Sequence, residues 1–404
     1  MKKIYSTLFL AAIASLSASA QQLPNAGFEN GWAKTTPYTG GASKETDGLS
    51  PESWTIAHVA GYKAPLLGWM GTTLVGGKEA PGYNGSQYAA VITNNPNSIA
   101  KSQKVPGYIT LGTPFNTANS SGNNKDGGSF GGIDFAYRPD ALSIQYKRTQ
   151  AANTTENGTV VAYLWKGTVK QANVRVSIGS NPTKITMENR DRNILGMETA
   201  YGDSPEKSAD FETIATINHA VVGSAADWTQ LVVPFDYTST AVPAKINVIF
   251  GAGDYFSTSP EEGNSMTIDD VKLIYYSRLA SLSVNGTALE GFASDNYTYT
   301  VDSEMPEESA FVYTTMGNSG CAKATVALDK ENAMATITVT NTNQGGTDID
   351  GEASHVYTIQ FNKTQAPEPT EPEGTKYTGS LNIKIEMLEI DVTQPDKIYI
   401  NDGG

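Results

Sequence analysis

Apolar and polar residues alternate with a period of two along most of the chain, which is the pattern of half-buried β-strands. The clearest stretch begins at Gln230, where the residues of one parity in QLVVPFDY are apolar or aromatic. A second stretch, KINVIF at residues 245–250, repeats this pattern. Pro234 interrupts the first stretch and cannot donate a ladder hydrogen bond. We therefore expect that strand to lie at a sheet edge or to carry a bulge.

A change of parity marks the strand that follows. Met266 and Ile268 share one parity, whereas Val271 and every second residue after it share the other. The switch falls at Asp269 and Asp270. A slip of one residue sends every later side chain to the opposite face, so the pattern predicts a β-bulge at the two aspartates. Such a bulge would turn one carboxylate out of the regular sheet.

The distribution of strand candidates predicts an all-β chain of several parts. Strand candidates separated by turn residues fill residues 21–276, the expected first β-sandwich domain. About seven strand candidates at short spacing in residues 277–363 predict a smaller sandwich. Residues 364–375 alternate Pro and Glu, as in a stiff linker. Residues 376–404 offer only two strand candidates, so we expect an incomplete C-terminal β domain.

Composition agrees with this organisation, and the N-terminal residues indicate the cellular compartment. The chain has 404 residues, enough for two or three domains with separate cores. Charged residues make up 17%, against roughly 25% in ordinary globular domains, and the 39 glycines suit short strands and turns. Residues 1–20 carry two lysines, an apolar run and small residues at the end, which predicts a secretory signal peptide. We expect a protein exported to the periplasm, the cell surface or the medium.

Charge excludes several classes of partner. The formal net charge is −14, and loss of the two lysines in the signal peptide would make it −16. Such a protein repels phosphate backbones and anionic lipid surfaces, so we expect no nucleic-acid partner. No later apolar run approaches the roughly 20 residues of a bilayer helix, so we expect no membrane insertion. The only cysteine, Cys321, cannot form an internal disulfide, and we expect it to be a small buried residue. We also expect the protein to be a monomer.

Several motifs together carry a family resemblance. They are GFENGW and PESW near the start, FAYRPDALSIQYKR in the middle, and DWTQLVVPFDY, GAGDYF and GNSMTIDDVKLIYY at the end. With these motifs, residues 21–276 resemble the putative carbohydrate metabolism domain (PCMD). The resemblance implies a jelly-roll-like β-sandwich, similar to carbohydrate-binding modules, in exported proteins concerned with glycans. The polar segment 178–211 departs from the pattern, and we expect it to be a loop excursion.

The later segments carry weaker resemblances. Residues 277–363 resemble the cadherin-like β-sandwich modules that act as spacers in exported bacterial proteins. The tail, residues 376–404, resembles the opening hairpin of a calycin-like β-barrel. Neither resemblance implies a further site.

Candidate glycan-binding residues follow from the chemistry of sugars. The C–H faces of a sugar stack on aromatic rings, and its hydroxyl groups bond to carboxylates and amides. All five tryptophans lie in the first domain, although tryptophan is also a common core residue. The candidates in turns and glycine-rich stretches are Trp54, Trp69, Tyr137, Arg138, Asp254 and Phe256.

A structural calcium ion is a second expectation. Jelly-roll carbohydrate modules often bring a glutamate near the first strand beside an aspartate of the closing strand. Glu29 and either Asp269 or Asp270 occupy comparable places here. Calcium takes six to eight oxygen ligands, so carbonyl groups or water would complete the site. The alternative is that these acids cap strand ends in water, and we expect no other cofactor.

The sequence thus favours an exported protein that binds a polysaccharide or other glycan without cleaving it. Two alternatives stay open. A glycoside hydrolase would need two carboxyl groups about 5 to 9.5 Å apart, with Glu29, Asp134, Asp254 and Asp270 as the acids available. An envelope scaffold or adhesin without a sugar ligand would bury Trp54 fully, and Trp69 with it.

The histidines support no catalytic or metal site. His58, His219 and His355 are scattered singly along the chain. This distribution disfavours a triad of Ser, His and Asp, and it disfavours zinc.

Overall fold

The structure is a computed structural model. It describes residues 22–34, 48–58, 60–64, 68–72, 74–94, 106–116, 127–176, 183–197, 202–257, 259–343 and 345–363. The predicted signal peptide, linker and C-terminal tail lie outside these ranges. Nearly all the regular structure in the described part is β, and the exceptions are the helix α1 (Asp191–Ile194) and the 3-10 turns η2 (Tyr83–Gly85) and η3 (Glu308–Ala310). The predicted all-β fold is confirmed.

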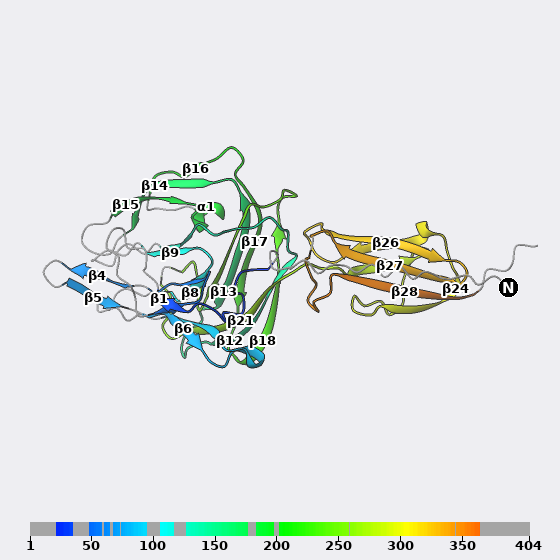
Figure 1. The fold of residues 1–404 in the computed structure, drawn as a ribbon, viewed down its shortest axis with the longest axis horizontal. Coiled ribbons are helices and arrows are strands. Elements are labelled where there is room, and N and C mark those ends of the chain that lie inside the picture. Colours follow the sequence, from blue (N-terminus) through cyan, green and yellow to red (C-terminus); the bar gives the residue numbers. More distant parts are fainter. Residues whose placement is uncertain are drawn as a thin grey trace, which may run out of the picture. The chain divides into compact units, whose positions relative to one another are not determined.

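Two antiparallel sheets form the first sandwich (Figure 1). The five-stranded sheet has the order β18 (Ala225–Pro234), β12 (Ala141–Thr149), β21 (Ser265–Ile274), β7 (Ala89–Thr93), β6 (Gly76–Glu79). The seven-stranded sheet has the order β19 (Asp236–Tyr237), β17 (Glu212–Val221), β13 (Gly158–Lys166), β20 (Lys245–Gly251), β8 (Tyr108–Thr110), β3 (Thr55–Ile56), and β11 (Ile133–Asp134) pairs with β20. Two short hairpins add β1 (Ala33–Lys34) with β2 (Leu49–Ser50), and β4 (Ala60–Ala64) with β5 (Gly68–Thr72).

The core of this sandwich lies between the two sheets. Leu142 and Ile144 of β12 and Ile268 of β21 contribute from one side, and Val248 and Phe250 of β20 from the other. Each of these side chains is buried. Full burial of an aliphatic or aromatic side chain stabilises a fold by about 1.5–3 kcal/mol. Successive side chains of a strand point to opposite faces, so the polar residues that alternate with these core residues in β12 and β21 face away from the core.

The bulge predicted at the paired aspartates is present. Ser143 of β12 pairs with Lys272 of β21, and Gln145 pairs with Asp269, so one residue of β12 faces two residues of β21. Asp270 has φ of 48°, in the left-handed region. This insertion of one residue keeps the apolar residues on both sides of the bulge in the core.

The edge position predicted from Pro234 is also confirmed. Pro234 is the last residue of β18, and β18 is the outermost strand of the five-stranded sheet. An edge strand tolerates proline because half of its backbone groups need no partner strand.

The outer face of the seven-stranded sheet is covered by other elements. They are β9 (Thr113–Asn116), β10 (Gly127–Phe130), β14 (Val169–Val176), β15 (Thr183–Glu188), β16 (Glu206–Lys207) and α1. In Figure 1, β14 to β16 and α1 lie on the side of the sandwich opposite to β6, β12 and β18. The described part of segment 178–211 thus contains two strands and a helix, which corrects the expectation of a loop excursion.

A buried polar network closes this covered face. Asn247 of β20 donates to Tyr163 Oη of β13 (2.7 Å) and to Ser129 Oγ of β10 (3.1 Å). The carboxylate of Asp191 in α1 accepts from Tyr255 Oη (2.5 Å) and from Ser129 N (3.3 Å). Burial raises the pKa of Asp191 above its usual value. These hydrogen bonds join β20, β13, β10 and α1 beneath this face.

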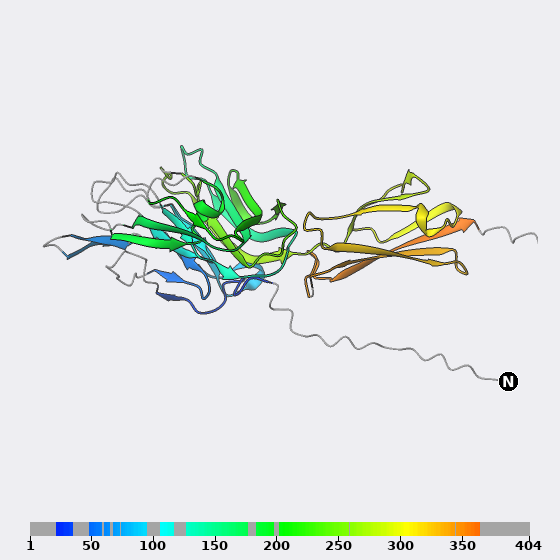
Figure 2. The same cartoon turned by 90° about the horizontal axis from the view of Figure 1, so that it is seen from above.

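The second sandwich has its own core (Figure 2). Its sheets have the orders β23 (Thr287–Ala288), β22 (Leu279–Val284), β25 (Phe311–Thr315), and β24 (Thr298–Glu304), β28 (Ser354–Lys363), β27 (Met334–Asn341), β26 (Ala322–Asp329). Strands β24 and β28 are parallel, and the other pairs are antiparallel. Ile337, Tyr357 and Ile359 are fully buried in this core. The cores are separate clusters, the first ending at Tyr275 and the second starting at Leu279.

Candidate functional site

The outer face of the five-stranded sheet carries a groove of about 510 Å³, which we call the outer-face groove. Its floor comes from β18, β12 and β21, and its rim from η2 and from the chain near Gly27. The bulge in β21 opens directly into it, since Asp269 and Asp270 both line the groove. The extra residue of this strand therefore lies at the groove.

The floor is a row of three polar side chains on neighbouring strands. Gln145 of β12 lies opposite Gln230 of β18 on one side and opposite Asp269 of β21 on the other. Side chains directly opposite one another on paired strands have Cβ atoms about 4.5–5.5 Å apart. The three groups therefore form one continuous polar strip across the sheet.

Gln145 is the distinctive member of this row. Only 8% of the residue is exposed, yet within the described part of the chain no protein group hydrogen-bonds its side-chain amide. Buried amides almost always have partners. Gln145 lines the groove, so its amide can donate to and accept from a molecule bound there.

Asp269 is held rigidly by the rim. Its Oδ2 accepts from Tyr83 N (2.7 Å) and Ser86 Oγ (2.6 Å), and its Oδ1 accepts from Asp270 N (2.7 Å). A Cβ on Gly82 would lie 2.5 Å from Asp269 Oδ2, so only glycine permits this approach. Burial raises the pKa of Asp269, and the nearby charge of Glu29 acts in the same direction.

Two aromatic rings border the groove. The rings of Tyr83 and Trp228 meet edge to face with centroids 5.8 Å apart. Trp228 lies two residues before Gln230 and so has the same parity in β18. Lys147 Nζ lies 4.8 Å from the centre of the Trp228 ring and also pairs with Glu79 Oε1 at 2.7 Å. Both rings are partly exposed and are held in place by these contacts.

The three acids predicted to bind calcium do line this one groove. Both carboxylate oxygens of Glu29 accept from Gln87 N (3.0 and 3.1 Å), and Asp270 pairs with Lys272 at 2.8 Å. In the described residues, no three His, Cys, Asp or Glu side chains form a set that could hold a metal ion. N–H donors and an ammonium group contact these three carboxylates, and the calcium ion stays a prediction.

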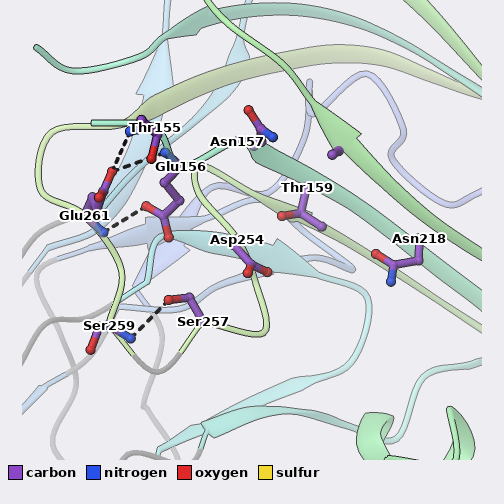
Figure 3. A pocket seen from close by; sticks show the side chains of 11 residues that line it. Thr155, Glu156, Asn157, Thr159, Asn218, Asp254, Ser257, Ser259 and Glu261 are labelled. Atoms are coloured by element: carbon purple, nitrogen blue, oxygen red, sulfur yellow. Dashed lines mark hydrogen bonds between the residues drawn. The ribbon is translucent and has the colours of Figure 1, made fainter. Parts of the chain in front are cut away.

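A second hollow of about 430 Å³, the loop-end pocket, lies where Asp254 and Glu156 meet (Figure 3). Glu156 Oε2 accepts from Glu261 N (2.8 Å), Asn94 Nδ2 (2.9 Å) and Asn264 Nδ2 (3.0 Å). Burial raises the pKa of Glu156, whereas Asp254 is exposed. The lining is mostly polar and has no aromatic ring. Most of these contacts fasten one loop to another.

The predicted ligand-binding tryptophans are not found exposed in the described structure. Trp54 is 2% exposed, and its indole N–H donates to Pro24 O (2.9 Å), so the expectation of an exposed ring was wrong. Its ring packs on Phe28 and Phe250 in the core. The side chain of Trp69 lies outside the described residues. The scaffold alternative requires that both Trp54 and Trp69 are buried, and the structure shows this for Trp54.

The other predicted ligand residues are scattered. Arg138 is buried, donates to the carbonyl oxygens of Ser239 (2.9 Å) and Ser319 (3.1 Å), and so cannot meet a ligand. Tyr137 is half-buried against Phe135. Phe256 is half-buried too, with its ring against Tyr255 and beneath Arg192. Of the six candidates, Asp254 alone lines one of the two hollows described above.

The four acids considered for hydrolysis do not all meet in one place. Asp134 is exposed and pairs with Lys245 at 2.9 Å. Asp254 lines the loop-end pocket, whereas Glu29 and Asp270 line the outer-face groove. The two sets belong to different hollows, so no pair of them that includes Asp134 or Asp254 can act on one glycosidic bond.

A Ser-His-Asp arrangement does form in the second sandwich, contrary to the expectation from scattered histidines. Ser277 Oγ lies 2.9 Å from His355 Nδ1, and His355 Nε2 lies 2.9 Å from Asp350 Oδ2. However, Ser277 is 0% exposed, and the ring of Tyr297 stacks on the His355 ring at 4.9 Å. No substrate can reach this hydroxyl group, so the arrangement is structural.

Sequence reasoning missed the main groove residues. Gln145 and Gln230 carry no motif, and only their alternation with core residues shows that they face outward. The useful signal was the parity switch at Asp269, because it located the bulge. Pairing of β12 between β18 and β21, which brings the glutamines beside that bulge, is not visible in one sequence.

Comparisons with known proteins leave the family open. No protein-family profile and no curated protein matches the chain. Among solved structures, two are described as putative glycoside hydrolases. The one from Bacteroides thetaiotaomicron has 15% identity and a TM-score of 0.31, covering 50% of this chain and 57% of that one. The one from Bacteroides vulgatus has 12% identity and a TM-score of 0.34, covering 60% and 99%.

An arabinose-bound α-L-arabinofuranosidase structure is also similar, at 11% identity and a TM-score of 0.27, covering 63% of this chain and 26% of that one. The chain spans 57% of the length of the first of these structures. At these TM-scores the similarities carry no inference about what this chain does. The resemblances to PCMD and to cadherin-like modules stay predictions.

Proposed function

We propose that this chain is an exported protein that binds a glycan in the outer-face groove and does not cleave it. The observation that carries the proposal is the amide of Gln145, a residue only 8% exposed, which no described protein group hydrogen-bonds and which lies in a row with Gln230 and Asp269. A carbohydrate presents closely spaced hydroxyl groups that both donate and accept, and such a row is complementary to them. The rings of Tyr83 and Trp228 at the border supply apolar surface for sugar C–H faces.

The groove supports binding rather than hydrolysis. A general acid or base needs an oxygen free to exchange a proton with the substrate. Here Asp269 accepts three hydrogen bonds, Glu29 accepts from backbone N–H groups, and Asp270 pairs with Lys272. These acids are therefore fixed as acceptors and charges.

Export is part of the proposal and rests on the signal-like residues 1–20, which lie outside the described structure. No helix in the described ranges is both long and apolar enough to cross a bilayer. Fractionation of cells that express the full chain tests this part. Recovery of the protein with the cytoplasmic fraction at its full, unprocessed mass would contradict export.

The binding site is tested by Gln145→Ala. We expect the affinity for the bound glycan to fall about tenfold, as the loss of one hydrogen bond of about 1.5 kcal/mol implies. Because no group in the described ranges bonds this amide, the melting temperature should change little. The measurement is calorimetric titration of the full chain against a panel of polysaccharides, repeated with calcium and with a chelator.

The matched control is Asn218→Ala, which removes an amide from the loop-end pocket instead. If Asn218→Ala weakens binding and Gln145→Ala does not, the site is the loop-end pocket. Recovery of shortened sugar after the titration would point to hydrolysis there by Glu156 and Asp254, and would overturn the non-catalytic proposal. The titrations with calcium and with chelator test the predicted ion, and equal affinity in both would contradict a role for it in binding.

A further inference from the structure

The carboxylates of the outer-face groove outnumber its cations. Glu29, Asp269 and Asp270 line it together with one ammonium group, that of Lys272. Lys272 Nζ lies 2.8 Å from Asp270 Oδ2, so these two charges offset each other. Among the described residues, no cation pairs with Glu29 or Asp269. With the acids ionised, the groove therefore carries a formal charge of −2.

The carboxylates also bias the groove toward accepting hydrogen bonds. Carboxylate oxygens accept only, and Glu29 and Asp269 have lone pairs left beyond the bonds they make to N–H and O–H groups. Hydroxyl and ammonium groups of a ligand can donate to them. A carboxylate or sulfate on a ligand would instead meet acceptors of like charge, and like-charge contacts suppress wrong partners.

We propose that the outer-face groove selects its glycan by charge, accepting neutral and amine-bearing sugars and rejecting those that carry carboxylate or sulfate groups. This inference rests on the proposed glycan binding in the same groove and narrows the class of sugar. The position of the acids carries it: Asp269 belongs to the floor row beside Gln145, so a bound sugar ring cannot avoid its charge.

Matched oligosaccharides that differ in charge and in one small substituent provide the test. We would titrate the full chain with oligogalacturonate and its methyl ester, and with chitin oligomers and their de-acetylated form. The neutral ester should bind about tenfold or more tightly than the acid at low salt. The difference should shrink as ionic strength rises, because the Debye length is about 10 Å at 0.1 M salt.

Two substitutions move the groove charge in opposite directions. Asp270→Asn frees Lys272 and makes the groove less negative by one charge, while asparagine tolerates the φ of 48° at this position. Lys272→Gln makes the groove more negative by one charge. We expect Asp270→Asn to narrow the ratio of ester to acid affinity and Lys272→Gln to widen it. Selection by charge would be overturned if the ratio of ester to acid affinity changed in the same direction in both variants, or if it changed in neither variant.

The outcomes separate the two proposals. If none of the oligosaccharides or polysaccharides binds, glycan binding itself is wrong. If acid and ester bind with equal affinity, and Gln145→Ala weakens both, glycan binding in the groove stands and selection by charge is wrong. If only the ester binds and the variants shift the ratio as expected, both proposals are supported.

Discussion

Single residues decide where a ligand could meet this protein. Arg138 and Trp54 have the chemistry of a sugar site, but their polar atoms are taken by backbone carbonyl groups. Gln145 has no distinguishing sequence context, but its amide is the one left to face a groove. Residue type alone therefore predicted the kind of contact and not its location. Location depends on which partners the fold supplies, and one sequence does not contain that information.

At the residue scale, the buried carboxyl group of Asp191 leads to a prediction about how folding stability depends on pH. Burial raises the pKa of its carboxyl group in the folded protein above the value of about 3.9 that an unfolded chain has. The folded state then holds the proton more tightly than the unfolded state. The stability from this group is fully present below pH 4 and is lost as the pH rises through the folded pKa.

The measurement is the melting temperature of the wild type and of Asp191→Asn from pH 4 to pH 7. The wild type should lose stability relative to the variant as the pH rises, because asparagine does not titrate. If the melting temperature of the wild type instead rises relative to that of the variant as the pH rises, Arg190 and Arg192 lower the pKa of Asp191 more than burial raises it.

At the scale of elements, the bulge in β21 makes a conformational demand on Asp270. Its φ of 48° is accessible to asparagine and strained for β-branched residues. Asp270→Val should therefore lower the free energy of unfolding by about 1–3 kcal/mol, whereas Asp270→Asn should change it little.

Both substitutions remove the ion pair with Lys272, so their difference isolates the backbone term. Urea unfolding of the two variants measures it. Equal stabilities would mean that the bulge relaxes, and the pairing of Gln145 with Asp269 would then shift.

The elements also show what the sequence could and could not predict. Alternation and the position of Pro234 predicted the strands near it and their edge position, because these depend on neighbouring residues. The parity switch predicted the bulge for the same reason. Segment 178–211 was misjudged, because its Asp191 is buried and accepts hydrogen bonds from Tyr255 and Ser129, and such long-range pairing overrides local polarity.

For the molecule as a whole, two separate cores allow a cavity to be opened in the second sandwich without touching the core beneath the groove. Ile337 is fully buried in the second core. Ile337→Ala should destabilise that sandwich by about 2–5 kcal/mol, since it leaves a cavity. Glycan affinity measured below the melting transition should not change.

Differential scanning calorimetry and titration of the same preparation check this prediction. The control is Ile144→Ala, which opens a cavity beneath the groove floor in the first core. This variant should lose both stability and affinity. Loss of affinity in Ile337→Ala would place the second sandwich in the binding function.

The bulge has a consequence for how this protein can diverge. Without Asp270 the strand would read Ile268, Asp269, Val271, Lys272 in strict alternation, so each of these side chains would keep its present face and only the bulge would be lost. Loss of this residue would therefore change the groove and spare the core. Relatives can change their sugar preference by substitutions in the floor row or by losing the bulged residue.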